Sequence, residues 1–134
     1  MSTADPIASF LAGSAFAVAG ASSNRAKYGN MVLRCYTQNG IRAYPVNPNE
    51  AEIEGLKAYP TLAELPERVH GVSIITPRWV TARLVDDAIA LGIKHLWMQP
   101  GAESYPAIER AQAAGVSVIH SGPCLLVVLG FRDE

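Results

Sequence analysis

The sequence has 134 residues and a formal net charge of −1 at pH 7. Of these residues, 49% are hydrophobic and 17% are charged, which is typical of a globular domain with its own core. So small a net charge exerts no overall attraction on nucleic acid or anionic lipid, and we expect neither nucleic acid nor a membrane as a partner. Any anion site must therefore come from a local arrangement of side chains.

The two cysteines are too few for a disulfide scaffold, and the sequence shows no secretory signal. The longest apolar runs, Phe16–Ala19 and Leu125–Leu129, are too short to cross a bilayer. We expect one cytoplasmic domain over residues 1–134, with an N-terminal helix in residues 1–13 and a core in residues 14–134.

Short apolar runs alternate with helical patterns along the chain. The opening segment Asp5–Leu11 predicts a helix that Asp5 caps, with Pro6 in its first turn. The predicted strands are Ser14–Ala19, Ile41–Val46, Val69–Thr76, Ile93–Met98 and Val116–His120. The predicted helices between them are Asn30–Gln38, Arg78–Leu91 and Tyr105–Ala114.

This alternation predicts parallel βαβ units, whose crossovers are right-handed almost without exception. We expect an α/β fold, a Rossmann-like doubly wound sheet of five parallel strands in the order 3-2-1-4-5, with helices on both faces. In such a sheet a ligand lies across the carboxyl ends of the strands, where the strand order reverses.

The loop after the first predicted strand is rich in groups that bind anions. A G-x-G-x-x-G fingerprint starting at Gly20 would need glycine where the sequence has Ser22 and Arg25. Hydroxyl, amide and cationic donors partly replace these glycines, and the start of the next helix adds its N–H groups. The alternative is a solvated turn with two surface cations. The candidate donors are Ser22, Ser23, Asn24, Arg25 and Lys27.

The loop after the second predicted strand lacks the acidic residue that holds ribose hydroxyls in NAD-binding domains. Asn47-Pro48-Asn49 stands there, and Glu50 follows only after the proline. A neutral amide does not repel phosphate, so this loop favours a ligand with a phosphorylated ribose, such as coenzyme A or NADP. The alternative is a simple Asn-Pro-Asn turn.

Two further loops offer apolar and amide groups. Ile75 and Pro77 would flank an adenine, although proline at a helix start has an equally ordinary structural role. Gln99 would orient a ligand amide or hydroxyl, and Gly101 allows a close backbone approach. Trp97 is predicted to be a core residue.

A family resemblance becomes specific at these strand ends. The motifs occur in one order and together cover nearly the whole chain from Ser14 onwards. They resemble those of small stand-alone CoA-binding proteins, a family similar to the CoA-binding domain of the succinyl-CoA synthetase α subunit. The motifs are Gly20-Ala21-Ser22, Lys27-Tyr28-Gly29, Tyr44-Pro45-Val46-Asn47-Pro48-Asn49, Trp97-Met98-Gln99-Pro100-Gly101 and Gly122-Pro123-Cys124.

The resemblance implies a Rossmann-like domain that binds coenzyme A. It assigns the first loop to the pyrophosphate, Asn47 and Pro48 to the adenosine, and Thr76 and Pro77 to the adenine. Gln99 and Gly101 would then flank the pantetheine. The predicted cofactor-binding residues are Gly20, Ala21, Ser22, Ser23, Asn24, Arg25, Lys27, Tyr28, Asn47, Pro48, Thr76, Pro77, Gln99, Gly101 and Cys124.

No catalytic set or metal-ligand spacing is found in the sequence, and we predict neither catalytic residues nor a metal site. The adjacent Asp86 and Asp87 are attributed to a solvated helix face. The histidines His70, His95 and His120 are scattered and predicted to be structural.

Cys124 carries one chemical hypothesis. It follows the fifth predicted strand, and His120, four residues earlier, would favour its thiolate. A mixed disulfide with the CoA thiol would then form under oxidation. The alternative is an inert cysteine packed beneath the apolar tail Leu125–Leu129, and Cys35 is predicted to lie in the core.

We therefore predict a non-catalytic carrier or sensor of CoA or acyl-CoA. One alternative is an NAD(P)-binding, oxidoreductase-like protein. Another is a subunit that needs a partner for activity. The tail Leu125–Leu129 would either cover the sheet edge or form a homodimer contact, and its sequence does not distinguish the two.

Overall fold

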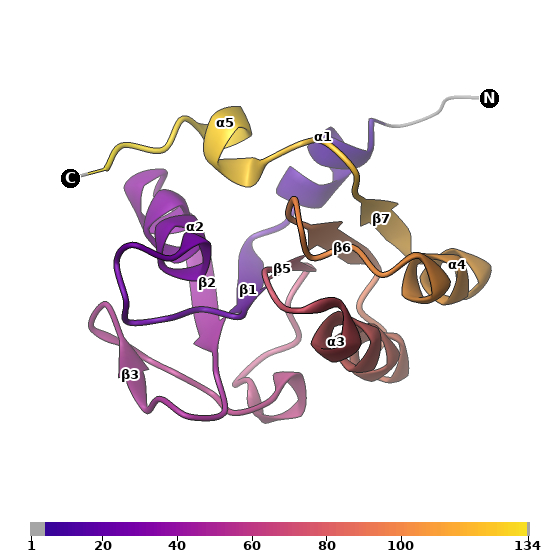
Figure 1. The fold of residues 1–134 in the computed structure, drawn as a ribbon, viewed down its shortest axis with the longest axis horizontal. Coiled ribbons are helices and arrows are strands. Elements are labelled where there is room, and N and C mark those ends of the chain that lie inside the picture. The colour runs from indigo at the N-terminus through magenta and orange to yellow at the C-terminus, as the bar shows by residue number, and fades with distance from the viewer. Residues whose placement is uncertain (1–4, 134) are drawn as a thin grey trace.

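The computed structural model describes residues 5–133 (Figure 1). Within that range five parallel strands form one sheet, and a two-stranded hairpin follows its second strand. The main-sheet strands are β1 (Ala15–Ala19), β2 (Arg42–Val46), β5 (Gly71–Ile74), β6 (His95–Met98) and β7 (Ser117–Ile119), and the hairpin strands are β3 (Glu52–Ile53) and β4 (Leu56–Lys57). The helices are α1 (Pro6–Leu11), α2 (Tyr28–Gln38), α3 (Arg78–Ala90), α4 (Tyr105–Ala113), α5 (Leu125–Leu129) and the 3-10 helix η1 (Leu62–Glu64).

The α/β fold class is confirmed, but the predicted strand order is wrong. The observed order is β2-β1-β5-β6-β7, so the third strand of the main sheet pairs with the first strand and not with the second. Pro45 has no N–H to give to a ladder, which suits β2 to the edge of the sheet. Every residue of β5 is buried, as a central position requires. The order therefore reverses between β1 and β5, and the ligand crevice is expected there.

Helices cover both faces of the sheet, as predicted. Figure 1 shows α1, α2 and α5 along one side and α3 and α4 along the other. On the first face the buried rings of Phe10, Phe16 and Tyr36 stack in series, with centroids 5.0 and 5.3 Å apart. The second face is aliphatic and includes Val72, Val85 and residues of η1 and α4. The alternating side chains of β1 supply both cores.

The connection from β2 to β5 was not predicted in detail. It contains the β3–β4 hairpin, whose turn is formed by Glu54 and Gly55, both at positive φ. The segment around Tyr59 then runs along the outer side of β2, where the Tyr59 N–H donates to Pro45 O at 3.0 Å. Two-residue strands give too weak a period-2 pattern to be recognised in a sequence.

The element ends agree with their sequence signals in most places. Asp5 caps α1, as predicted, and its Oδ1 accepts a hydrogen bond from the Ile7 N–H at 3.0 Å. Asn39 ends α2 and Gly40 follows it at positive φ. However, α2 begins at Tyr28, two residues before the predicted start.

The apolar tail forms the helix α5, which was not predicted. This helix packs against α2 on one face of the sheet and does not run along an edge strand. Leu125 is fully buried, whereas the Val127 side chain is 80% exposed. The sheet-edge interpretation of the tail is therefore wrong, and its outer side remains apolar.

The backbone passes unusually close to itself where β1 ends. A Cβ atom added to Gly29 would lie 1.9 Å from Gly20 O, and one added to Gly20 would lie 2.0 Å from Ile75 O. Gly20 also has φ +94, which favours glycine. The end of β1, the start of α2 and the end of β5 are thus held together without intervening side chains.

We expect Gly29→Ala to lower the free energy of unfolding by about 3 kcal/mol or more, because the new methyl group meets backbone that has no room to move. Gly40→Ala is the control: nothing lies within 4 Å of a Cβ there, and only its φ of +69 is unfavourable. That control should lose about 1–2 kcal/mol. Urea denaturation measures both, and equal losses would show that the α2 start yields easily.

Candidate functional site

The carboxyl ends of the parallel strands bring five loops to one edge of the sheet. In Figure 1 these loops lead from β1 to α2, from β2 to β3, from β5 to α3, from β6 to α4 and from β7 to α5. All the predicted cofactor-binding residues belong to these loops or to the first turns that follow them. The topology therefore gathers at one edge residues that are as much as a hundred positions apart in the sequence.

Two cavities adjoin each other at this edge. The first, here called the loop cavity, has a volume of about 610 Å³ and lies beside the loop between β1 and α2. The second, the helix cavity, has a volume of about 550 Å³ and lies between α3, η1 and the end of β2. Gly20 and Asn47 line both cavities, so a long ligand would pass between them at these two residues.

Many of the predicted residues line these cavities. Besides Gly20 and Asn47, the predicted residues of the loop cavity are Ala21, Ser22, Lys27 and Tyr28, and those of the helix cavity are Pro48 and Thr76. The other predicted residues line neither cavity. They are Ser23, Asn24, Arg25, Pro77, Gln99, Gly101 and Cys124.

The polar side chains of the first loop shape their own turn. Ser22 Oγ accepts from the Asn24 N–H at 3.0 Å, and Asn24 Oδ1 accepts from the Ala26 N–H at 3.0 Å. Such side-chain-to-backbone bonds fix a turn in the way an additional peptide group would. Both side chains therefore organise the loop, and the Ser22 hydroxyl keeps its proton as a donor.

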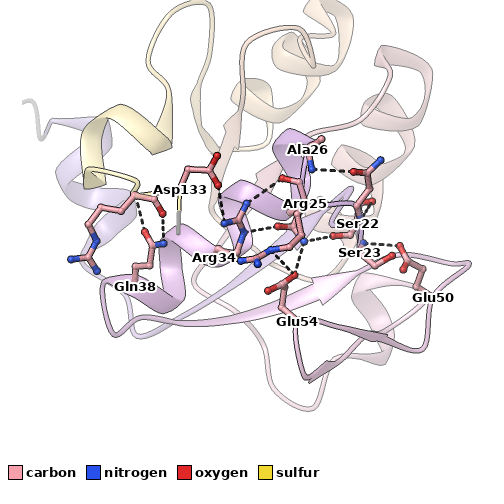
Figure 2. Close-up of polar contacts among 12 residues, drawn as sticks. Ser22, Ser23, Arg25, Ala26, Arg34, Gln38, Glu50, Glu54 and Asp133 are labelled. Atoms are coloured by element: carbon pink, nitrogen blue, oxygen red, sulfur yellow. Dashed lines mark hydrogen bonds and ion pairs between the residues drawn. The ribbon is translucent and has the colours of Figure 1, made fainter.

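Carboxylates already contact the donors of this loop (Figure 2). The Ser23 N–H donates to Glu50 Oε2 at 3.1 Å, and Arg25 Nε lies 3.5 Å from Glu54 Oε2. Glu50 was not among the predicted site residues because it follows the proline turn, but this turn brings its carboxylate back to the first loop. Its hydrogen bonds from Ser23, and next the charge of Lys27, lower the pKa of the Glu50 carboxyl. Glu50 is therefore anionic at neutral pH.

Two residues of α2 that sequence reasoning missed hold the loop from below. Asn30 is fully buried, and its Nδ2 donates to Ser22 O at 2.8 Å. Arg34 is 6% exposed, and its guanidinium donates to Asn30 Oδ1 at 2.6 Å and to Arg25 O at 3.1 Å. Their spacing of four residues could have indicated this, because residues i and i+4 of a helix lie on the same side.

Arg34 also joins the loop to the end of the chain. Its Nη1 lies 3.2 Å from Asp133 Oδ1, and its guanidinium lies over the Phe131 ring at 5.0 Å. Beside it, Gln38 exchanges hydrogen bonds with the backbone of Arg132 (Figure 2). One buried cation therefore couples the first loop, α2 and the segment after α5.

The helix cavity has apolar walls with charged residues at its rim. Leu62, Val80 and Leu84 contribute apolar surface. Asp86 and Asp87 also line it, although they had been attributed only to a solvated helix face. Asp86 is paired with Arg110, with 3.0 Å between Nε and Oδ1, so part of its charge is balanced.

Gln99 has one hydrogen-bonded amide atom and one unpaired amide donor. It is 3% exposed, and its Oε1 accepts from the Leu125 N–H at 3.0 Å, at the start of α5. Its Nε2 is buried and has no hydrogen-bond partner among residues 5–133. Buried donors are rarely left unpaired, so this amide is suited to a ligand carbonyl or hydroxyl. Trp97 is fully buried, as predicted, and its indole N–H donates to Pro123 O at 3.0 Å.

Cys124 is half-buried at the start of α5. The predicted helper, His120, has another partner: its Nδ1 lies 2.6 Å from Ser121 Oγ, which in turn lies 3.0 Å from Tyr105 OH. Cys35 is in the core, as predicted. Burial first, and then the neighbouring Cys124, raise the pKa of the Cys35 thiol to about 11, so Cys35 stays protonated at neutral pH.

The remaining two histidines lie at the opposite edge of the sheet. The rings of His70 and His95 stack with centroids 4.2 Å apart, and His70 Nε2 lies 2.9 Å from Ser9 O. Burial, and then the neighbouring His70, lower the pKa of His95. Among residues 5–133 no group of three His, Cys, Asp or Glu side chains could hold a metal ion. None of the described helices has the length and apolar character needed to cross a membrane.

A family model described as a CoA binding domain matches residues 14–130. The chain belongs to the CoA-binding domain family. This membership confirms the resemblance predicted from the strand-end motifs, and it supports CoA as a small-molecule partner.

Relatives of this CoA-binding domain include short proteins and parts of large enzymes. A conserved hypothetical protein from Pyrococcus furiosus superimposes with a TM-score of 0.80 at 42% identity, covering 84% of this chain and 97% of that one. The acetate–CoA ligase (ADP-forming) I of Archaeoglobus fulgidus is 28% identical over 120 residues, which are 81% of this chain and 17% of the ligase.

A dinucleotide-forming acetyl-coenzyme A synthetase 1 from Ca. Korarchaeum cryptofilum, solved with phosphate and ADP, gives a TM-score of 0.72 at 31% identity. The match covers 80% of this chain and 25% of the synthetase. The CoA-binding domain thus spans only a small part of the enzymes that it resembles, whereas it matches the Pyrococcus furiosus protein over almost its full length.

We expect Arg34→Ala to lower the free energy of unfolding by about 3 kcal/mol, because it removes the donor to the buried Asn30 Oδ1, the hydrogen bond to Arg25 O and a buried cation that pairs with Asp133. The control is Arg110→Ala, which removes a half-exposed ion pair and should cost about 1 kcal/mol or less. Chemical denaturation measures both. A loss for Arg34→Ala no larger than that of the control would show that the guanidinium does not hold the loop.

Proposed function

We propose that this CoA-binding domain binds coenzyme A or an acyl-CoA reversibly across the two adjoining cavities, as a non-catalytic carrier or sensor. The observation that carries the proposal is the meeting of the two cavities at Gly20 and Asn47. One cavity has cationic and amide donors, and the other has apolar walls, which match the phosphate and adenine portions of one ligand.

The loop cavity suits the pyrophosphate of the ligand. Lys27 lines it, Arg25 is close by with a half-exposed side chain, and the N-terminus of α2 opens onto it. Backbone N–H groups and the helix dipole favour an anion at such a terminus. Gly20 and Gly29 both line this cavity.

The helix cavity suits the adenine. Its apolar wall is formed by Leu62, Val80 and Leu84, while Thr76 and Asn47 offer polar groups. Adenine needs a flat apolar slot with a few hydrogen-bonding groups, which is the usual composition of a nucleotide pocket. The family resemblance assigns Gln99 to the pantetheine portion; Gln99 lines neither cavity, so its buried Nε2 would contact pantetheine only if the chain around it opened.

The composition of the site supports the proposed carrier or sensor role. The titratable residues that line the two cavities are Lys27, Tyr28, Glu50, Arg83, Asp86 and Asp87, and no nucleophile paired with a base is among them. Activity would therefore need a partner, in the manner of a subunit, and the exposed apolar side of α5 at Val127 and Val128 offers a contact for a partner or a second copy. The cytoplasmic location and the extent of the domain over residues 1–134 stay part of this proposal.

We expect titration calorimetry to show CoA binding that is tighter than NADP binding. Arg25→Ala combined with Lys27→Ala should weaken CoA binding about tenfold or more at low salt and flatten its salt dependence, because two charges near the phosphates are lost. Tighter binding of NADP than of CoA would favour the oxidoreductase-like alternative and overturn the proposal.

The matched control for this variant is Arg68→Ala combined with Lys94→Ala. These two cations lie at the amino-terminal edge of the sheet, so the control removes the same charge far from the cavities. CoA affinity should not change in the control. Equal losses in both variants would assign the effect to overall charge and would remove the first loop from the site.

We expect Cys124→Ser to retain reversible CoA affinity but to lose any covalent adduct with CoA disulfide. In the exchange reaction the Cys124 thiolate attacks one sulfur of CoA disulfide, a protein–CoA disulfide forms, and one CoA thiolate leaves and takes up a proton. Mass spectrometry without reductant measures the adduct. Cys35→Ser is the control and should still form it, whereas an adduct that survives in Cys124→Ser would move the chemistry to Cys35.

A further inference from the structure

Three donors around the first loop contact carboxylates of the protein itself. The Ser23 N–H is bonded to Glu50, and Glu54 Oε2 lies 3.5 Å from Arg25 Nε and 3.0 Å from Asn30 Nδ2. Of these donors, Arg25 is the cation that the proposed function places near the ligand phosphates, and Ser23 lies in the same loop. The protein's own carboxylates therefore contact donors of the first loop that would also attract an incoming anion (Figure 2).

Both carboxylates come from a single segment, Asn47–Gly55, between β2 and the hairpin turn. Asn47 Nδ2 holds Glu50 at 3.3 Å, and Glu54 adopts φ +51, which is uncommon for a residue other than glycine. Through Glu50 and Glu54, segment 47–55 contacts the first loop, and its residues Asn47, Asn49 and Glu50 line the loop cavity.

A carboxylate and a phosphate compete for the same donors, since at neutral pH both only accept hydrogen bonds. A pyrophosphate placed beside Glu50 and Glu54 would be repelled by both, because like charges a few ångströms apart disfavour each other. Ligand phosphates can use these donors only after the carboxylates have withdrawn.

We propose that Glu50 and Glu54 are selectivity-determining residues that occupy the phosphate site and are replaced by the phosphates of the ligand. This inference rests on the proposed function. A ligand with a pyrophosphate replaces the contacts of Glu50 and Glu54 with stronger ones, because phosphate oxygens accept charge-assisted hydrogen bonds from the same cation and N–H groups. A ligand without phosphate leaves the carboxylates where they are. The site therefore discriminates by the charge of the ligand, and segment 47–55 moves when a phosphate-bearing ligand binds.

The test compares Glu50→Gln, Glu54→Gln and the double variant with the wild type, using CoA, adenosine and inorganic pyrophosphate as separate probes in titration calorimetry. Glutamine keeps the size of each side chain and removes its charge. The double variant should bind CoA and pyrophosphate about tenfold more tightly than the wild type, because two like charges beside the phosphates are gone. Adenosine affinity should not change. Glu52→Gln, an exposed position in the same hairpin, is the matched control and should leave all three affinities unchanged.

Unchanged or weaker binding of pyrophosphate by the double variant would overturn the inference. If the double variant bound both CoA and adenosine more weakly, the inference would also be wrong, and Glu50 would instead be an acceptor for ribose hydroxyls. The pyrophosphate titration tests the inference about Glu50 and Glu54 even if no form of the protein binds CoA. Failure to bind CoA would contradict the proposed function alone. As an independent readout, the Ser23 amide resonance should shift in ligand-free Glu50→Gln, and an unmoved resonance would contradict the contact itself.

Discussion

Where β1 ends, the backbone of Gly20 lies against that of Gly29 in the first turn of α2, and no side chain would fit between them. This contact sets the angle at which α2 leaves the sheet and the short path of the loop between them. Ser22, Lys27 and the start of α2 therefore line one cavity, and Arg25 lies beside it. The two cavities, the position of Asn47 between them and the reach of Arg34 beneath the loop all depend on this approach.

The electrostatics of the site are local, in keeping with a net charge near zero. Arg25, Lys27 and the start of α2 supply positive potential beside the loop cavity, and the carboxylates of Glu50 and Glu54 offset part of it. A cavity that lacked such counter-ions would leave desolvated cations and N–H groups unpaired, which is unfavourable. If Glu50 and Glu54 occupy the phosphate site as proposed, ligand affinity is a difference between two sets of similar contacts.

The relatives differ in how much of their length this fold accounts for. In the acetate–CoA ligases the matching region is a small fraction of the enzyme, whereas the Pyrococcus furiosus protein is matched over 97% of its length. A Rossmann-like domain supplies a binding edge and leaves chemistry to residues added around it. The cavities described above fit that division, with binding groups on the carboxyl edge and an apolar helix, α5, on the surface beside it.

The fold class and the family followed from local patterns: alternating elements, Asp5 at a helix start, and the strand-end motifs around Gly20, Asn47 and Gln99. These features act over a few residues, so a sequence displays them. The strand order, the helical form of the tail and the return of Glu50 to Ser23 were decided only by the tertiary structure. Each of these depends on contacts between residues distant in the chain, where burial and the pairing of charges outweigh local preference.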